Sequence, residues 1–531
     1  MKRRGLLGHI FTVGAFTMLS RVLGLVREML QSRLVGAGVE QSAFALAFML
    51  PNAARKLFGE GALTAAFVPV FRGEVESAGL ERASRFARTV LTMVLLLLTA
   101  VVAVALAGLV GTLVMADAFA LASRTRLTLS LVAILIPYMV AICGAAFGMG
   151  VLNALGRFKA SSFMPALLNL VWIAALVVLS LVSGLSAVTC VRIVAAAILV
   201  GGFAQMAFMF ACMSRAGVTP RLLFSGWRDE KVRLVWHNLA IAAIGAGAIH
   251  ANYLLDQTLA QCAAPWAAGV ISFAERLMDL PLGVIGVAFG TVLLPTFAGL
   301  FAKNDAEGAR EAFFSSVRNM MFVMLPAAAG LFVLAPEVTR VIYEGGRFDA
   351  VATTRVARAV SVYALGLGFF GLQKALVPWF QAQKDMKTPL RVSLATVAVN
   401  ATLNILAVWL LPQEWRHVGL AASTVLCALI GCVLLLRAAR ISTFSLQPPA
   451  SSLQPSTSNL QPLFSYLARV LIASLAMAAV LVFVRPPETL PPLVQLAVLI
   501  AEGLVVYGVL AVVLRILRFP APPRQTRGDL V

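Results

Sequence analysis

Charged side chains stand within three of the long apolar segments of the sequence, where hydrocarbon alone would not accommodate them. They are Arg21, Arg27 and Glu28 in the first segment, Arg55 in the second, and Glu275, Arg276 and Asp279 in a later one. A charge at the centre of a bilayer costs roughly 2.5–3.5 kcal/mol on insertion scales, so it normally faces a cavity or a partner. An arginine guanidinium can bind two phosphate oxygens at once. The pattern therefore predicts a hydrated anion-binding cavity, and a pyrophosphate carried on a lipid would fit it.

The same charges could instead neutralise one another and hold the helices together. The basic set is Arg21, Arg27, Arg55, Lys56 and Arg276, and the acidic set is Glu28, Glu60, Glu275 and Asp279. Arg276 and Asp279 are three residues apart and could pair along one helix. Both interpretations, a ligand cavity and a set of structural ion pairs, remain open from the residues alone.

A single acid, Asp256, lies within another apolar segment. A lone carboxylate inside a membrane is by default a cation or proton site, and hard cations such as Na⁺ prefer oxygen ligands. Asn400 and Thr402, in a later segment, could add two more oxygens. The alternative is a plain hydrogen bond from Asp256 to His250 or to a neighbouring helix.

The sequence indicates no other metal, cofactor or catalytic site. Its six cysteines include no CxxC pair, and its four histidines lack the spacing of zinc ligands. No Walker loop is present, so we do not expect ATP as the direct energy source. No paired catalytic carboxylates and no nucleophile–base set stand out. We therefore expect a transporter rather than an enzyme.

The elements that position these residues are predicted to be transmembrane helices. The chain has 531 residues, of which 60% are hydrophobic and 12% charged, and its mean hydropathy is +0.91. Soluble domains are roughly 45–50% apolar and about 25% charged. Apolar stretches of about 20 residues, each long enough to cross a bilayer, recur along the chain. We expect an all-α integral membrane protein of about fourteen helices, at 8–33, 40–71, 84–115, 127–153, 160–184, 188–213, 234–261, 267–299, 312–336, 352–381, 388–411, 417–438, 463–484 and 491–516.

The net charge of +20 does not indicate nucleic-acid binding, because the basic residues form small groups between apolar segments. Lys and Arg gather in cytoplasmic loops of membrane proteins. If Lys2, Arg3 and Arg4 are cytoplasmic, the even-numbered gaps between helices are also cytoplasmic, and they are the richer in basic residues. We therefore expect both termini on the cytoplasmic side.

The chain also shows signs of internal duplication. Pro51 and Pro281 are separated by 230 residues, and Lys159 and Lys387 by 228. An interval of six helices keeps both halves in the same orientation, as in parallel transporter repeats whose substrate site lies between them. The phrase Ser-Leu-Gln-Pro recurs near the C-terminal end and is typical of an extended linker. We expect an N-terminal lobe at 1–214, an inter-lobe cytoplasmic loop at 215–233, a C-terminal lobe at 234–440, the linker at 441–462, a final helix pair at 463–517 and a cytoplasmic tail at 518–531.

Several of these segments together resemble the MurJ (MviN) family of lipid II flippases. The similarity is carried by Ser20–Gly24, Leu50–Asn52, Phe58–Ala62, Glu275–Val284, Gly290–Pro295, Tyr343–Phe348 and Gln383–Pro389. The resemblance implies a multidrug/oligosaccharidyl-lipid/polysaccharide exporter fold, with two six-helix lobes and an additional pair whose groove holds the polyprenyl tail. It implies movement of lipid II, the undecaprenyl-pyrophosphate-linked peptidoglycan precursor, to the outer leaflet of the bacterial inner membrane by alternating access.

The resemblance further assigns roles to single residues. It implies that Arg21, Arg27, Arg55 and Arg276 line the headgroup cavity, and that Asp256 matches an acid in the family's seventh helix. Na⁺ or the membrane potential is then the expected energy source. Besides lipid II and membrane lipids, peptidoglycan synthases are candidate partners of a protein expected to act as a monomer.

This chain departs from the family pattern at Ser42, where members often carry an acid before Ala-Phe. A carboxylate function at that position is therefore in doubt. Two other functions stay open. One is a flippase for a different polyprenyl-linked oligosaccharide, and the other is a multidrug or cation exporter of the same fold. A cationic drug site should be acidic and aromatic, whereas the expected cavity is rich in arginine.

Overall fold

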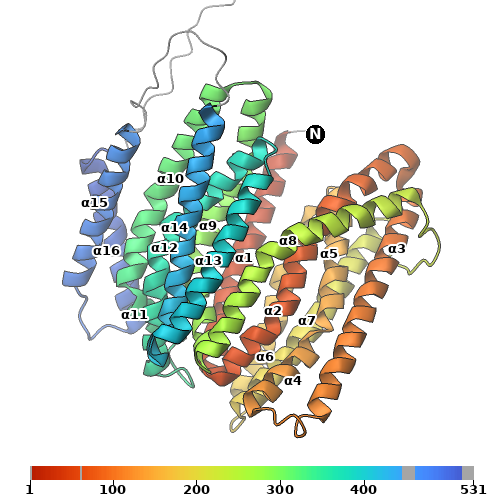
Figure 1. Ribbon diagram of the computed structural model, residues 1–531, viewed down its shortest axis with the longest axis horizontal. Helices are drawn as coiled ribbons and strands as arrows, with labels where there is room; N and C mark the ends of the chain where they lie inside the picture. Colours follow the sequence, from red (N-terminus) through yellow and green to blue (C-terminus); the bar gives the residue numbers. More distant parts are fainter. Residues whose placement is uncertain (1–2, 60–61, 445–460, 517–531) are drawn as a thin grey trace, which may run out of the picture. The chain divides into compact units, whose positions relative to one another are not determined.

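The computed structural model describes residues 3–59, 62–444 and 461–516. In this part of the chain the regular structure is helical, and β pairing is confined to one isolated bridge between Gly345 and Phe348. The helices (Figure 1) are α1 (Arg3–Val35), α2 (Val39–Gly59), α3 (Ala62–Val114), α4 (Ser123–Leu135), α5 (Tyr138–Ala154), α6 (Phe158–Leu181), α7 (Ala187–Arg215), α8 (Glu230–Ala263), α9 (Ala267–Ala302), α10 (Ala306–Val333), α11 (Ala335–Tyr343), α12 (Ala350–Ala382), α13 (Lys387–Leu410), α14 (Gln413–Phe444), α15 (Gln461–Phe483) and α16 (Pro492–Val513).

Ten segments among the described residues are long and apolar enough to cross a membrane. This confirms the predicted all-helical membrane protein, while the count of fourteen spans stays a prediction. The charged residues of the predicted site lie on four helices: Arg21 and Arg27 on α1, Arg55 on α2, Asp256 on α8 and Arg276 on α9.

One predicted helix boundary is wrong. The interval 72–83, expected as a gap between helices, is helical within α3 except at Gly79, which has φ 79° and ψ 169°. Glycine adopts this conformation without a Cβ clash, so the chain bends there rather than forming a loop. The segment 127–153, expected as one membrane helix, lies within one span, Ser123–Ala154. Its helix is interrupted at Pro137 between α4 and α5, because proline lacks the N–H that a continuous helix would use.

A third difference is the short helix α11, which the sequence pattern did not separate from the preceding span. The predicted span 312–336 corresponds to α10, which ends at Val333. The predicted linker 441–462 overlaps the ends of α14 and α15, and its residues 445–460 lie outside the described part, as does the tail 518–531.

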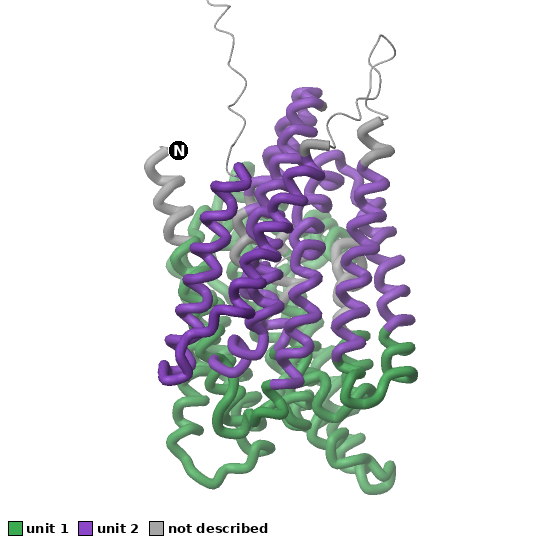
Figure 2. The backbone as a smooth tube through the Cα atoms, turned by 90° about the vertical axis from the view of Figure 1, so that its left-hand side faces the viewer, with its two compact units in different colours: residues 1–273, 342–353, 404–417 green, residues 274–341, 354–403, 418–531 purple. Residues whose placement is uncertain are grey.

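The chain divides into two compact units (Figure 2). Unit 1 comprises residues 1–273, 342–353 and 404–417, and unit 2 comprises residues 274–341, 354–403 and 418–531. In unit 1, α1 packs on α6 and α7, α2 packs on α4, α5 and α8, and α3 packs on α5 and α8. In unit 2, α15 packs on α10 and α16. The division into the predicted lobes stays a prediction.

Aromatic side chains and small residues build the core of unit 1. The ring of Phe67 lies 5.3 Å from that of Phe71 and 4.6 Å from that of Phe147, measured between centroids. Gly202 of α7 faces Tyr138 so closely that an added Cβ would lie 2.3 Å from its ring. Small residues at such a crossing let helix backbones approach, which is the common basis of helix packing in membranes.

Candidate functional site

The charged residues of α1 are held by α6. Arg27 forms an ion pair with Glu28, donates a 2.9 Å hydrogen bond from Nη1 to Asn169 Oδ1, and places its guanidinium 4.3 Å from the ring centroid of Trp172. The side chains of Arg27 and Glu28 are only 11% and 12% exposed. Stacking of a guanidinium on tryptophan is favourable, more so away from water. Arg27 is therefore fixed in place by contacts on several sides.

Asn169 also fixes the register of the two helices. Its Nδ2 donates to the backbone oxygen of Ser20 at 3.0 Å. Gly24 of α1 leaves space for the Asn169 side chain, because an added Cβ on Gly24 would lie 3.9 Å from Asn169 Nδ2. Arg21 follows Ser20 on α1 and is half-buried. The same amide thus supports Arg27 and anchors the turn that carries Arg21. Asn169 and Trp172 were not among the predicted site residues.

Arg55 lies on α2 next to the turn that contains Pro51. Its Nε donates to Asn52 Oδ1 at 3.2 Å. Lys56 and Glu60, also named in the charge count, lie outside the residues whose side chains are described.

The third charged cluster, Glu275, Arg276 and Asp279, begins unit 2 on α9. Arg276 and Asp279 are exposed and Glu275 is half-buried. The structure thus joins Arg27 with Glu28 directly and places both near the helix turn of Arg21. The grouping of all the arginines around one cavity stays a prediction.

Asp256 is bound by a residue that the sequence interpretation missed. Asn404 Nδ2 donates to Asp256 Oδ1 at 2.6 Å, and Asn404 is buried in α13. Asn404 follows the predicted ligand Asn400 by four residues, a spacing that puts both on one helix face. Thr402, also predicted, is exposed and donates its Oγ1 proton to the backbone oxygen of Ala398 at 2.9 Å. The signal for Asn404 was therefore present in the helical spacing from Asn400.

Ser42 lies at the position where the family pattern often has an acid, and it links α2 to α8 and α9 by hydrogen bonds. Its Oγ accepts the Gly269 N–H at 2.9 Å, and its backbone oxygen accepts from Gln261 Nε2 at 2.7 Å. The side chain is fully buried. An added Cβ on Gly269 would lie 3.1 Å from Ser42 Oγ, so little space is left for a larger group.

The arrangement of the helices defines a class of membrane transporter. The chain is similar to a solved structure described as lipid II flippase MurJ in an inward closed conformation, with a TM-score of 0.74, 20% identity, and coverage of 95% of this chain and 98% of that one. It is also similar to an inward-facing multidrug resistance MATE family transporter of the MOP superfamily, with a TM-score of 0.69, 15% identity, and coverage of 83% and 99%. The fold is that of the MOP superfamily.

Sequence comparison narrows this class to one family. The model of the family described as lipid II flippase MurJ matches residues 31–501. Relatives named probable lipid II flippase MurJ are 38% identical over 76% of this chain and 75% of the Rhizobium tropici protein, and 31% identical over 78% and 79% for Rickettsia prowazekii. A protein of Burkholderia cenocepacia, named lipid II flippase MurJ, is 30% identical over 80% and 82%. The chain belongs to the MurJ family.

Proposed function

We propose that this protein moves lipid II, an undecaprenyl-pyrophosphate-linked disaccharide-peptide, from the inner to the outer leaflet of the bacterial inner membrane. The family assignment over residues 31–501 is the observation that carries this proposal. The product supplies peptidoglycan synthesis, so the protein serves cell-wall biogenesis as a transporter and makes or breaks no bond in its substrate.

The basic surplus of the first two helices supports a pyrophosphate ligand. Between residues 20 and 59 the sequence has five basic and two acidic residues. Guanidinium groups in a site of restricted water bind phosphate oxygens by charge-assisted hydrogen bonds. Arg27 is fixed by Glu28, Asn169 and Trp172, so little side-chain freedom remains to be lost on binding. We propose that Arg27 orients the substrate headgroup and also holds α1 in its orientation.

In this proposal Arg21 and Arg55 contact the pyrophosphate from the N-terminal lobe and Arg276 from the C-terminal lobe. Arg276 is exposed on α9 and therefore accessible to a ligand. In this proposal Glu28, Glu275 and Asp279 orient the arginines by pairing with them in turn. We further propose that the chain crosses the membrane fourteen times, in two lobes of six spans plus a final pair for the polyprenyl tail, with both termini cytoplasmic, and that it works by alternating access.

We propose that Na⁺ binds beside Asp256 and α13, and that this binding couples Na⁺ to transport of the substrate. The donors fit a hard cation in type, because a carboxylate and the amide oxygens of Asn404 and Asn400 are oxygen ligands. In the structure Asn404 turns its amide nitrogen toward Asp256. Binding of Na⁺ beside Asp256 therefore requires the Asn404 amide to rotate its oxygen toward the ion. The bound cation would supply charge compensation for Asp256 during the transport cycle.

Depletion of the protein in its host tests the proposed substrate. We expect lipid II to accumulate on the inner leaflet, and its fraction accessible to a membrane-impermeant headgroup reagent to fall. Re-expression of the wild-type chain should restore both. Accumulation of a different polyprenyl-linked oligosaccharide, with lipid II unchanged, would contradict the proposal.

A further inference from the structure

The segment that joins α7 and α8 exposes large apolar side chains between arginines. Leu222, Phe224 and Trp227 are 54%, 65% and 66% exposed, and they lie between Arg221 and Arg228. A loop in water would not normally expose three such groups within six residues. Tryptophan and phenylalanine next to arginine are instead typical of the membrane–water interface.

Hydrogen bonds to α3 fix the position of this loop along the length of α3. Thr92 Oγ1 accepts the Leu223 N–H at 2.7 Å, and Thr89 Oγ1 donates to the Ser225 backbone oxygen at 2.9 Å. Thr89 and Thr92 stand where the long apolar run of α3 begins, directly after Arg85 and Arg88. The loop therefore lies at the level where the surface of α3 changes from basic to apolar, which is the boundary between headgroups and acyl chains.

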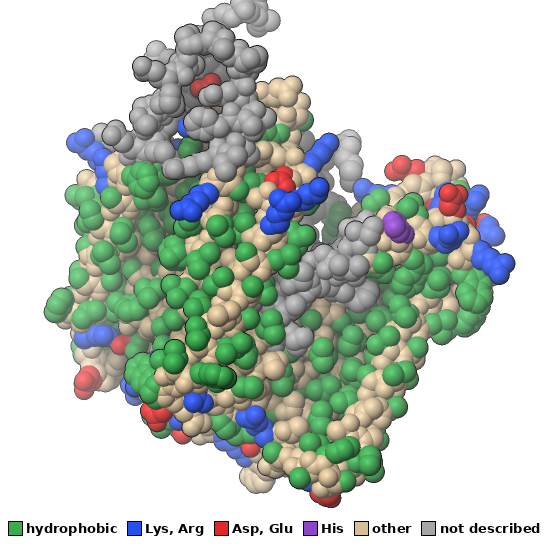
Figure 3. All heavy atoms as spheres, viewed as in Figure 1, with side chains coloured by type: hydrophobic (Ala, Val, Ile, Leu, Met, Phe, Trp, Pro, Cys, Tyr) green, Lys and Arg blue, Asp and Glu red, His purple; other side chains and the backbone are tan. Residues whose placement is uncertain are grey.

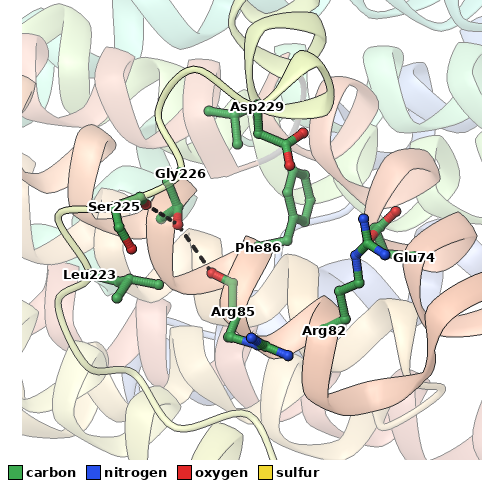
Figure 4. Close-up of a pocket in the computed structure, with 10 residues that line it drawn as sticks. Glu74, Arg82, Arg85, Phe86, Leu223, Ser225, Gly226 and Asp229 are labelled. Atoms are coloured by element: carbon green, nitrogen blue, oxygen red, sulfur yellow. Dashed lines mark hydrogen bonds and ion pairs between the residues drawn. The ribbon is translucent and has the colours of Figure 1, made fainter.

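A cavity of about 390 Å³ lies between this loop and α3 (Figure 4). Arg82, Arg85 and Phe86 line it from α3, and Leu223, Ser225 and Gly226 line it from the loop. Figure 4 shows Leu223, Ser225 and Gly226 on one side and Arg82 with Glu74 on the other. The cavity thus combines guanidinium groups, a hydroxyl and a glycine backbone, which are groups that bind phosphate oxygens.

The acids near the cavity are already engaged by basic groups or backbone. Glu74 is buried and forms an ion pair with Lys231, and Arg82 Nε lies 3.7 Å from its other oxygen. Asp229 Oδ1 accepts the Lys231 N–H at 2.8 Å at the start of α8. Glu81, which is 91% exposed, lies 3.8 Å from Arg85 Nη2, and the side chains of Arg82 and Arg85 both remain 64% exposed. Figure 3 shows Lys and Arg side chains, with Asp and Glu side chains among them, at the upper right over the bent part of α3 and the start of α8.

We propose that Arg221–Arg228 and the cavity behind it form a docking surface for the headgroup of an anionic glycerophospholipid. The phosphate lies against Arg82, Arg85 and the loop backbone, while Leu222, Phe224 and Trp227 insert among the acyl chains. The net positive charge of 221–233, with four basic and two acidic residues, matches an anionic leaflet. The loop joining the halves of the chain is thereby anchored to the membrane surface, whichever lipid-linked substrate is transported.

Native mass spectrometry of the full-length protein, purified with mixed phosphatidylglycerol and phosphatidylcholine, tests this proposal. The wild type should retain phosphatidylglycerol several-fold over phosphatidylcholine. The double variant Arg82→Ala, Arg85→Ala should lose that preference. The matched control Lys159→Ala, Arg215→Ala removes two exposed charges at the same end of unit 1, outside the cavity, and should keep it.

A second variant, Phe224→Ser with Trp227→Ser, changes only exposed side chains and should also reduce retention. Thermal unfolding of each variant without added lipid checks that it folds. Equal preference in the wild type and both loop and cavity variants would overturn the proposal, as would an equal loss in the control. Stabilisation by inorganic phosphate alone, equal to that by phosphatidylglycerol at matched ionic strength, would assign the cavity to a free anion instead.

Discussion

At the residue scale, single side chains in this protein support one another in pairs contributed by different helices. Arg27 of α1 is held by Asn169 and Trp172 of α6, and Asp256 of α8 is held by Asn404 of α13. Burying a charge in hydrocarbon is costly unless it is hydrogen-bonded or paired. The positions of the charges were readable from the sequence, because arginine and aspartate interrupt apolar segments. The neutral partners of Arg27 were not, since asparagine and tryptophan within a membrane helix carry no comparable signal, whereas the partner of Asp256 was indicated only by the spacing of Asn404 from Asn400.

Sodium should stabilise the protein through Asp256. At a Na⁺ concentration about 100-fold above the dissociation constant, binding to the folded state alone would add about 2.7 kcal/mol of stability. We expect the melting temperature in detergent to be higher in NaCl than in choline chloride, and the difference to vanish in Asp256→Ala.

The control for this experiment is Asp117→Ala, which removes an acid whose side chain is 90% exposed in the segment after α3. It should keep the full response to sodium. A wild-type melting temperature that is the same in both salts would remove the proposed sodium site.

At the element scale, the loop between α11 and α12 is bound to the end of α1 within unit 1. The Arg347 N–H donates to the Arg33 backbone oxygen at 2.9 Å, and Arg347 Nη1 donates to the Leu34 oxygen at 2.6 Å. Gly346 has φ +58°, and an added Cβ would lie 2.4 Å from the Arg33 oxygen. The glycine is required twice, for its backbone conformation and for the close approach.

Gly346→Ala should therefore destabilise the protein more than a glycine change that affects conformation alone. Gly184 provides that comparison, because it has φ +82° with nothing within 4 Å of an added Cβ. A left-handed conformation costs a non-glycine residue roughly 1–2 kcal/mol. We expect Gly184→Ala to lower the unfolding free energy by about that amount and Gly346→Ala by clearly more, measured by thermal unfolding in detergent. Equal losses would show that the contact with Arg33 is not tight.

A second element depends on Asp385, which precedes α13. Its Oδ1 accepts the N–H groups of Lys387 at 3.1 Å and Thr388 at 3.0 Å, so it caps the helix. Hydrogen bonds from the Thr388 side chain and backbone lower the pKa of the Asp385 carboxyl. The cap's contribution is thus fully present above the ordinary pKa of aspartate and is lost as the pH falls through the lowered value.

Asp385→Ala should lower stability at neutral pH by about 1 kcal/mol, the usual effect of removing such a cap. Asp385→Asn is the matched control, because asparagine caps helices comparably but does not titrate. It should keep the stability at neutral pH and lose the part of the acid dependence due to Asp385, as measured by thermal unfolding between pH 3 and 7. A destabilised asparagine variant would contradict the capping role.

At the scale of the whole molecule, the sequence was sufficient for the class of protein and for the family. Apolar segments of membrane-spanning length predicted the all-helical architecture, since hydropathy determines which segments leave water. It was not sufficient for the continuity of α3 across 72–83, where the polar residues predicted a gap, or for the interruption at Pro137, which lies within an apolar run. Ser42 likewise shows its function only through Gly269 and Gln261, which are distant in sequence and adjacent in unit 1.

In the proposed function, arginines from both halves of the chain bind one pyrophosphate. Charge-assisted hydrogen bonds contribute about 1.5–3 kcal/mol each, so losing two should slow transport by well over tenfold. The direct measurement is translocation of fluorescent lipid II in proteoliposomes by the Arg21→Ala, Arg276→Ala double variant, followed with a membrane-impermeant quencher. The control Arg485→Ala removes an exposed arginine paired with Glu337 and should transport normally. We expect the double variant to fold and reconstitute but to translocate lipid II well over tenfold more slowly than the wild type; wild-type rates in that variant would contradict the proposed pyrophosphate site.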